Sequence, residues 1–437
     1  MKHQLKLLTA IVAGTLASSA VYATNGYAPH GIGLHSKGMG GVYIAYQGDA
    51  VATGGNPAGS AFMQDRVDLG VDVFRPVRDT EISGNMTPFG SMDGEYDGNN
   101  YSQFYIPEMG YRKGITSDMA FAFSLFGNGG MNTDYKDGIP LFNQTGDRTG
   151  INLEQLFLVP SMSFKLGGTQ SIGVGLNLVA QSFKARGLWN FTGTGTSMFD
   201  PRYSEDPTKV TNNDKNWSYG AGARIGWMGK FNNVTLGATY QTRTYMSKFD
   251  EYAGLFAEGG DFDVPSNYGA GIAVQATPNL VMSFDYVRIN YSEVDSISNP
   301  MSNLFDCSYI GGTDSEACLG GDNGPGFGWD DIDIFKVGVE YKLNSAWTLR
   351  GGYNHGSAPI PESETMFNIL APATVEDHLT LSVSWFPAPD QELTVAYMHA
   401  FENTIEGENS IPAGFGGGEA DITMYQDSLG VQYTWNL

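Results

Sequence analysis

The feature that most constrains the fold of this chain is an alternation of apolar and polar residues with a period of two, repeated in segments of about ten residues. Near the C-terminus the apolar face comprises Leu429, Val431, Tyr433, Trp435 and Leu437. The residues between them form a polar face of Gly430, Gln432, Thr434 and Asn436. Strands that separate lipid from a polar lumen have this pattern, so it predicts a transmembrane β-barrel. A soluble β-sandwich also alternates, and the connections between strands decide between the two.

Fourteen segments of this kind follow one another along the chain. They cover residues 67–79, 102–113, 117–127, 153–166, 171–185, 217–230, 234–246, 267–277, 280–292, 332–343, 346–354, 376–387, 391–402 and 421–437. Single-chain bacterial outer-membrane barrels have an even number of strands, as here.

Two kinds of connection alternate between these segments. Short turns, such as 167–170 and 344–345, alternate with long polar, Gly-rich stretches. The long stretches are 80–101, 128–152, 186–216, 247–266, 293–331, 355–375 and 403–420. In outer-membrane barrels short turns lie in the periplasm and long loops lie outside, so both ends of the barrel are expected in the periplasm. A sandwich does not need two such classes of loop, and we therefore predict an all-β fold, an antiparallel barrel of fourteen strands over residues 63–437.

Composition agrees with a barrel and excludes two other classes of protein. Charged residues make up 16% of the chain, against about 25% in globular proteins. Beyond the N-terminus there is no run of about 18 apolar residues, which excludes a helical membrane protein. Asp and Glu number 47, against 24 Lys and Arg. A nucleic-acid-binding protein needs a basic face, so no nucleic-acid partner is expected.

The first residues have the features of an export signal. Lys2 and Lys6 precede an apolar core at 7–16, and Val21-Tyr22-Ala23 supplies small residues at a cleavage site. We therefore predict a signal peptide over residues 1–23 and a mature protein in the bacterial outer membrane. Residues 24–62 are rich in Gly and have no period of two. They are either disordered or folded into the lumen as a plug, for which a fourteen-stranded barrel has room.

Cys307 and Cys318 are the two cysteines of the chain, in a segment rich in Gly, Asp and Ser. In an oxidising compartment this pair is predicted to form a local disulfide. A metal site would need further ligands, and no His lies nearby in the sequence. The chain also lacks a Gly-x-Ser-x-Gly or His-Glu-x-x-His motif, so we expect neither an enzyme nor a cofactor.

Several short motifs together resemble a known family. In the leader they are His30-Gly31-Ile32-Gly33, Gly38-Met39-Gly40-Gly41, Asp49-Ala50 and Asn56-Pro57-Ala58-Gly59. Further along they include Tyr252-Ala253-Gly254-Leu255-Phe256-Ala257, Gly328-Trp329-Asp330-Asp331 and Pro359-Ile360-Pro361. With these motifs the chain resembles the FadL family of outer-membrane transporters for long-chain fatty acids and other hydrophobic compounds. The resemblance implies that 24–62 is a hatch inside the barrel. It also implies that a ligand passes from a groove between loops to a pocket in the lumen and leaves sideways into the membrane.

The resemblance also implies roles for individual residues. Asn56, with Pro57 and Ala58, would hold the hatch, although a simple Asn-Pro turn before a strand is the alternative. The ligand groove is expected between loops 186–216 and 247–266, at Leu188, Trp189, Phe191, Tyr252, Leu255 and Phe256. Exposed apolar side chains often mark a binding site, but a loop can also tuck them inward. Gly127 would allow a kink that opens a lateral gap, or it simply begins the following loop.

Lys184 and Arg186 are the candidates for contact with a fatty-acid carboxylate. Two observations leave room for a neutral ligand as well. Asp330 and Asp331 stand where a second cation would be sought, and without the signal peptide the formal charge is −25, which gives an anion no electrostatic steering.

We therefore predict passive uptake of long-chain fatty acids or similar hydrophobic molecules. Uptake of neutral hydrocarbons is the alternative within this class, and a surface adhesin or receptor barrel is the alternative of another class. The expected partners are the hydrophobic ligand, outer-membrane lipid and lipopolysaccharide, and we expect a monomer.

Overall fold

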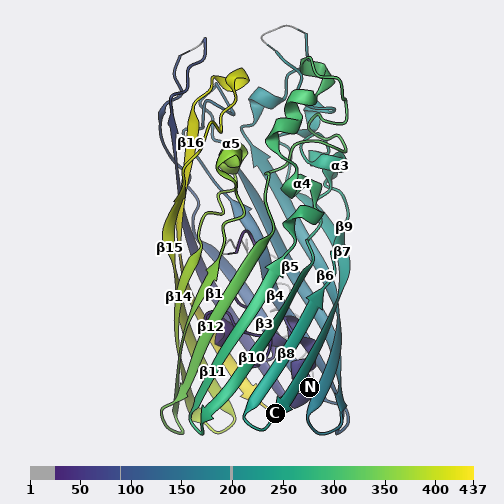
Figure 1. Cartoon of the computed structure of the whole chain (residues 1–437), viewed down its shortest axis with the longest axis vertical. Helices are drawn as coiled ribbons and strands as arrows, with labels where there is room; N and C mark the ends of the chain where they lie inside the picture. Colours follow the sequence, from purple (N-terminus) through teal and green to yellow (C-terminus); the bar gives the residue numbers. More distant parts are fainter. Residues whose placement is uncertain (1–24, 89, 197–199) are drawn as a thin grey trace.

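A computed structural model describes residues 25–88, 90–196 and 200–437. It has the form of a tall barrel whose strands run obliquely around a central lumen (Figure 1). The predicted signal peptide, residues 1–23, lies outside the described residues. None of the helices formed by the described residues is long and apolar enough to cross a membrane.

Fourteen strands of the described chain form the barrel wall. They are β1 (Arg66–Ser83), β3 (Phe104–Gly114), β4 (Met119–Asn132), β5 (Gly150–Leu166), β6 (Gln170–Arg186), β7 (Asn216–Phe231), β8 (Val234–Gln241), β10 (Asn267–Thr277), β11 (Leu280–Ile289), β12 (Ile332–Lys342), β13 (Trp347–Gly356), β14 (Asp377–Ala388), β15 (Gln391–Ile405) and β16 (Glu419–Asn436). Two short strands, β2 (Gly94–Asp97) and β9 (Tyr245–Met246), extend the wall by pairing with β1 and β7.

The strands pair antiparallel in sequence order, and β1 pairs with β16 to close the ring. This closing register runs from Arg66 opposite Asn436 to Ser83 opposite Glu419. The predicted fold class and the fourteen predicted strands are therefore confirmed. A closed ring leaves no free sheet edge at this join, as a wall in lipid requires.

Two of the predicted strands end three or more residues earlier than expected. The segment 234–246 stops at Gln241. There the Thr242 hydroxyl accepts a hydrogen bond from Ala223 N and donates one to Arg243 O, and the chain rejoins the wall only at β9. The segment 280–292 stops at Ile289, because Tyr291 turns inward to pack on Tyr27.

Short turns and long loops lie at opposite ends of the barrel (Figure 1). The C-terminus lies at the end with the turns, and the long loops carry the helices α3 (Ala257–Gly260), α4 (Asp295–Ser298) and α5 (Thr365–Asn368). The same loops contain the 3-10 helices η3 (Trp189–Phe191), η4 (Pro207–Lys209), η5 (Asp250–Tyr252), η6 (Tyr291–Glu293), η7 (Met301–Asp306), η8 (Ser308–Ile310), η9 (Glu362–Glu364) and η10 (Ala413–Phe415).

The two faces of each strand differ as the alternation predicts. On β6, Leu176 is 57% exposed, whereas its neighbour Asn177 is fully buried. Apolar side chains thus cover the outside of the wall, and the polar ones face the lumen. A rim of exposed aromatic residues, including Trp217, Tyr219 and Tyr245, marks the upper part of the outer surface.

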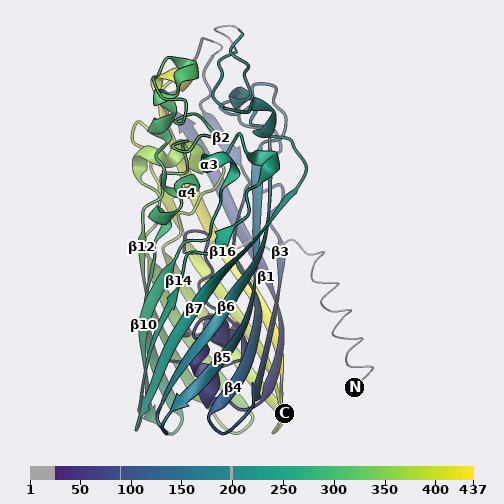
Figure 2. The same cartoon turned by 90° about the vertical axis from the view of Figure 1, so that its right-hand side faces the viewer.

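Residues 25–62, called here the N-terminal segment, are buried inside the barrel (Figure 2). The segment forms α2 (Leu34–Lys37) and the 3-10 helices η1 (Val51–Gly54) and η2 (Pro57–Phe62). Because a buried backbone without regular structure must still pair its polar groups, polar side chains of the wall supply the partners. Asp285 on β11, for example, accepts hydrogen bonds from the backbone N–H groups of Tyr43 and Ile44, at 2.7 and 2.8 Å.

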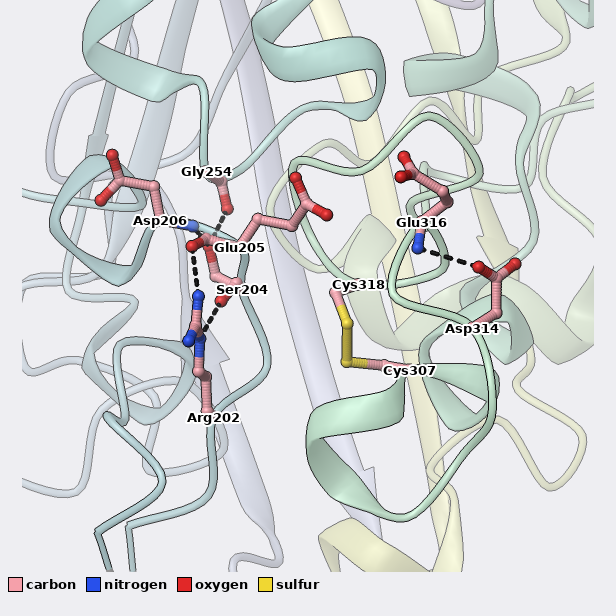
Figure 3. The surroundings of a disulfide bond; sticks show 9 residues. All are labelled: Arg202, Ser204, Glu205, Asp206, Gly254, Cys307, Asp314, Glu316 and Cys318. Atoms are coloured by element: carbon pink, nitrogen blue, oxygen red, sulfur yellow. Dashed lines mark hydrogen bonds between the residues drawn. A yellow bond between two sulfur atoms is a disulfide. The ribbon is translucent and has the colours of Figure 1, made fainter.

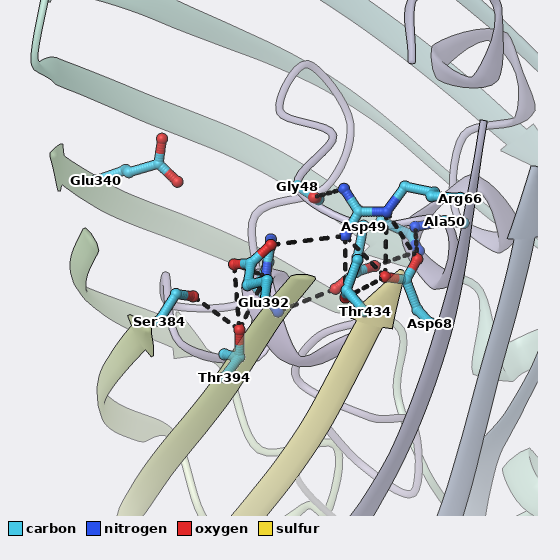
Figure 4. Close-up of polar contacts among 12 residues, drawn as sticks. Gly48, Asp49, Ala50, Arg66, Asp68, Glu340, Ser384, Glu392, Thr394 and Thr434 are labelled. Atoms are coloured by element: carbon cyan, nitrogen blue, oxygen red, sulfur yellow. Dashed lines mark hydrogen bonds and ion pairs between the residues drawn. The ribbon is translucent and has the colours of Figure 1, made fainter. Parts of the chain in front are cut away.

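Charged residues tie the same segment to several strands. Lys37 lies between the carboxylates of Asp72 on β1 and Glu108 on β3. Arg66 donates to Gly48 O at 2.9 Å, and Asp68 accepts from Ala50 N at 2.7 Å (Figure 4). The lumen is therefore filled by a segment that is bonded to opposite sides of its wall.

The disulfide predicted between Cys307 and Cys318 is present in loop 293–331 (Figure 3). It closes a short loop that packs on the neighbouring loop around Tyr203. Leu319, next to Cys318, donates its N–H to Tyr203 O at 2.9 Å. The disulfide thus fixes a loop at the open end of the barrel, beside the pocket described next.

Candidate functional site

An apolar pocket of about 510 Å³, including its open mouth, lies among the long loops. Its lining comprises Phe142, Ile151, Phe183, Leu188, Phe191, Leu255, Phe256, Ser296, Leu319, Pro325, Gly326, Phe327, Phe367 and Leu370. Ser296 supplies the polar side chain of this lining, and none of these residues is charged. Such a pocket suits a hydrophobic molecule, because transfer of apolar surface from water is favourable.

Four of the six residues predicted for the ligand groove meet in this pocket: Leu188, Phe191, Leu255 and Phe256. Trp189 does not line the pocket, and its side chain is 47% exposed. The role of these six residues in ligand binding stays a prediction.

Tyr252 lies behind the pocket wall, fully buried, with its ring 4.8 Å from that of Phe183. Its hydroxyl accepts a hydrogen bond from Ala185 N and donates to Asn213 O, both at 3.1 Å. Burial raises the pKa of Tyr252 to about 12, so the phenol is neutral. Tyr252 therefore joins two loops and does not face the cavity.

The rest of the lining comes from other loops and from the wall, and its residues were not predicted from the sequence. Leu319 and Phe327 belong to loop 293–331, Phe367 and Leu370 to loop 355–375, and Phe142 to loop 128–152. Large apolar residues in polar, Gly-rich loops were the signal used for Leu255 and Phe256. The same signal was present at these positions.

A chain of aromatic contacts leads from the pocket down to the N-terminal segment. Phe256 contacts Phe262 at 5.0 Å between ring centroids, and Phe327 contacts Trp329 at 6.2 Å. The rings of Phe262 and Trp329 lie 6.3 and 6.0 Å from that of Tyr27. Tyr27, near the start of the segment, is therefore separated from the pocket lining by one layer of aromatic rings, Phe262 and Trp329.

Tyr27 also rests on an irregularity of the wall. The pairing of β4 with β5 shifts register between Gly127 and Gly129, which marks a β-bulge. Gly130 N donates to Tyr27 O at 3.3 Å. A Cβ on Gly129 would lie 2.5 Å from the same oxygen, so this close approach requires glycine.

At this bulge the ladder between β3 and β4 is interrupted. The last described pair on this side is Met109 opposite Leu125, although β3 continues to pair with β1 up to Phe104. The two sides meet again above, where Asp134 N donates to Gly98 O at 3.0 Å. Between these points, residues 104–108 and 126–132 face each other without a described strand pair. We call this stretch the seam; Gly127 lies at its lower end, and its predicted role in a lateral gap stays a prediction.

Asn56 forms contacts in three directions. Its side-chain N–H groups donate to Ile44 O at 2.7 Å and to Trp227 O of β7 at 3.3 Å, and its side-chain oxygen accepts from Ala58 N at 3.1 Å. Pro57 begins η2, and Ala58 O accepts a hydrogen bond from Ser171 of β6 at 2.8 Å. The three residues predicted to hold the hatch therefore join the segment to itself and to two strands.

Lys184 and Arg186 lie elsewhere than the apolar pocket. Phe183 and Ala185 of β6 are buried on the inner side, so the alternation of the strand places both cations on the outer face. The two residues line a separate polar pocket there. Their predicted contact with a ligand carboxylate stays a prediction.

Among the described residues no group of three or more His, Cys, Asp and Glu side chains is placed to hold a metal ion. The arrangement consists of an apolar pocket, a buried segment beneath it and a seam in the wall. Residues 10–436 match the model of a family described as outer membrane protein transport protein (OMPP1/FadL/TodX). The chain belongs to this family. As a member of the FadL/TodX family, it is an outer-membrane transport protein, and the predicted location is confirmed.

Solved structures of FadL/TodX proteins share the fold. The Pseudomonas putida toluene transporter TodX is 18% identical with a TM-score of 0.68, and the match covers 93% of this chain and 99% of TodX. A Pseudomonas aeruginosa FadL homologue is 16% identical with a TM-score of 0.69, over 94% of this chain and 99% of that one. The Ralstonia pickettii toluene transporter TbuX is 20% identical with a TM-score of 0.63, over 93% and 99%. The search of curated proteins found no match.

Proposed function

We propose that this FadL/TodX protein takes up neutral hydrophobic small molecules by passive diffusion. The observation that carries the proposal is the lining of the loop-end pocket, which contains no charged residue. A carboxylate buried there would lose its hydration without gaining a cation, at a cost of several kcal/mol. A neutral hydrocarbon has no such cost. Two of the structural neighbours are named as toluene transporters, which is consistent with a ligand of this kind.

The path proposed for the ligand follows the contacts beneath the pocket. Tyr27 separates the pocket from the seam, since its ring contacts Trp329 and its carbonyl rests on Gly130. A shift of Tyr27, with the rest of the N-terminal segment held by Asn56, would connect the pocket to the seam. The segment thus acts as the hatch, and the ligand leaves between β3 and β4 into the membrane. No energy source is required.

Ligand binding by the purified, delipidated protein tests the proposal. Toluene and a C18 fatty acid are titrated separately against the wild type, Phe256→Ala and Trp189→Ala. We expect saturable toluene binding that Phe256→Ala weakens by about tenfold or more, because a buried Phe contributes about 1.5–3 kcal/mol. Trp189→Ala is the matched control, since that ring does not line the pocket, and it should bind as the wild type does.

The other outcomes are also informative. Tighter binding of the fatty acid than of toluene would show that the transporter recognises a carboxylate. Binding of neither ligand would contradict uptake through this pocket, and the interpretation as a receptor or adhesin barrel would then be favoured.

A further inference from the structure

A second, polar pocket lies on the outside of the barrel wall, at the upper end of the seam. It has a volume of about 620 Å³, including its open mouth. Its lining comprises Tyr101, Asn132, Thr133, Asp134, Arg148, Gly150, Ile151, Asn152, Lys184 and Arg186. Most of these residues come from the facing ends of β4, β5 and β6 and the loops that follow them.

The height of this outer pocket follows from the strand register. Lower on the same face of β6, Leu176 and Leu178 are exposed to lipid. Ser182 pairs with Trp217, an exposed aromatic residue of the upper rim, and Lys184 and Arg186 follow two and four residues later. At about 3.3 Å per residue they lie roughly 7 and 13 Å further along the strand. Aromatic rims mark the membrane interface, so these cations lie at the level of lipid headgroups.

The charges around this outer pocket do not cancel. Arg148 pairs with Asp134, and Lys215 pairs with Glu154 at 2.7 Å. In the part of the chain that the structure describes, neither Lys184 nor Arg186 forms an ion pair or a side-chain hydrogen bond. Two positive charges therefore remain in a polar pocket that faces the membrane surface, in a protein whose formal charge is −23.

The opposite side of the barrel differs at the same rim. There three basic side chains of the outer face have carboxylate partners. Arg288 pairs with Asp333 at 2.9 Å, His355 with Asp377 at 2.7 Å, and His399 with Asp427 at 2.9 Å. These three side chains thus each have an acidic neighbour, whereas Lys184 and Arg186 on β6 have no carboxylate partner among the described residues.

We propose that Lys184 and Arg186, with Asn152 and the paired Arg148 beside them, bind a phosphate group of lipopolysaccharide. Arg and Lys side chains form strong charge-assisted hydrogen bonds with phosphate, and basic pockets at membrane interfaces bind lipid headgroups. The outer leaflet in contact with this wall presents phosphate at this height. The site is independent of the proposed uptake path, although the bound lipid lies beside the upper end of the seam.

Native mass spectrometry of the delipidated full chain in detergent tests this site. The protein is titrated with a lipopolysaccharide that has a truncated sugar chain and both lipid phosphates, and with the same lipid after removal of the phosphates. We expect Lys184→Gln/Arg186→Gln to weaken binding of the phosphorylated lipid by about tenfold or more, since two charged hydrogen bonds are lost. Removal of the phosphates should weaken binding to the wild type to a similar extent.

The control variant Lys209→Gln/Lys248→Gln loses the same charge from two residues that do not line the outer pocket, and it should bind as the wild type does. Lys184→Arg/Arg186→Lys should retain binding, because it keeps both cations. The proposal is overturned if the neutral variant binds the phosphorylated lipid as the wild type does, or if the control variant loses as much affinity. Displacement of the lipid by inorganic phosphate at millimolar concentration would also overturn it, since the site would then take free phosphate. Lys184→Gln/Arg186→Gln could instead lose fatty-acid binding and keep lipopolysaccharide binding. That outcome would overturn the proposal and assign both cations to the transported ligand.

Discussion

At the residue scale, Asn56 shows how many hydrogen bonds a single buried side chain can make. Its amide donates to Ile44 O and Trp227 O and accepts from Ala58 N, so it uses three of its hydrogen-bonding groups in a fully buried position. A Cβ on Gly226 would lie 2.0 Å from its side-chain oxygen, which shows how closely β7 approaches it. Neither a hydroxyl nor a carboxylate offers the same two donors and one acceptor.

We expect Asn56→Ala to loosen the N-terminal segment by about 1–3 kcal/mol, because two carbonyl oxygens and one N–H lose their partner. Hydrogen exchange of residues 44–58 measures this change. Ligand uptake should fall while the amount of barrel at the cell surface stays normal. Asn56→Asp keeps the acceptor for Ala58 N and loses the donors, so it should resemble the Ala variant if the tie to β7 matters most. Unchanged uptake in both variants would show that Asn56 has no part in the hatch.

Lys184 and Arg186 show what the sequence of a strand can and cannot predict. The alternation of β6 places Lys184 and Arg186 on the same outer face as Leu176 and Leu178, so the sequence contained their orientation. The height of the two cations relative to the rim and the lack of acidic neighbours could not be predicted, because both depend on which strands pair.

At the scale of elements, the strands could be predicted because each one has to face lipid on one side and the lumen on the other. The seam could not be predicted, although Gly127 was noted. A bulge follows from pairing with β5, and the interrupted ladder follows from how β3 and β4 diverge. The pocket lining was predicted in part for a similar reason: apolar loop residues are visible in the sequence, but which loops meet is set by the closed barrel beneath them.

Gly129→Ala tests the contact between β4 and the N-terminal segment. The new Cβ would lie 2.5 Å from Tyr27 O, a backbone atom, so Tyr27 has to move. Overpacking of this kind costs about 1–3 kcal/mol, and we expect exchange of the amides at 26–30 to accelerate by about tenfold. Gly70→Ala is the control, because its Cβ would meet only ordinary contacts from 3.4 Å. Equal exchange in the two variants would contradict the placement of Tyr27 on the bulge.

At the scale of the whole molecule, the barrel wall is closed by contacts that do not include the N-terminal segment inside it. The strand ladder is formed by residues 66–436, and closure by β1 and β16 does not involve the N-terminal segment. The segment in turn depends on the wall, since its bonds reach β1, β3, β7, β11 and other strands. This division explains why the barrel was the most predictable part of the protein. The conformation of residues 25–62 has no period and follows from the lumen that surrounds it.

A chain that keeps its first 24 residues and lacks residues 25–62 should therefore still assemble. We expect it to migrate as a folded barrel on unheated gels and to conduct ions in planar bilayers better than the full chain, because water enters the vacated lumen. Conductance equal to that of the full chain would show that the loops close the barrel without the segment. Failure to assemble, with no folded band on the gel, would show that the barrel wall needs the N-terminal segment in order to fold.

The exit proposed at the seam has a consequence for the direction of transport. A molecule that leaves through the side of the barrel passes from an apolar pocket to hydrocarbon without an intervening aqueous step. Its net flow then depends on how the molecule partitions between the medium and the bilayer, and it stops when the two reach partition equilibrium. The rate of uptake would then be set by how fast the metabolism of the cell removes the molecule from the membrane. The protein itself would need no regulatory mechanism of its own.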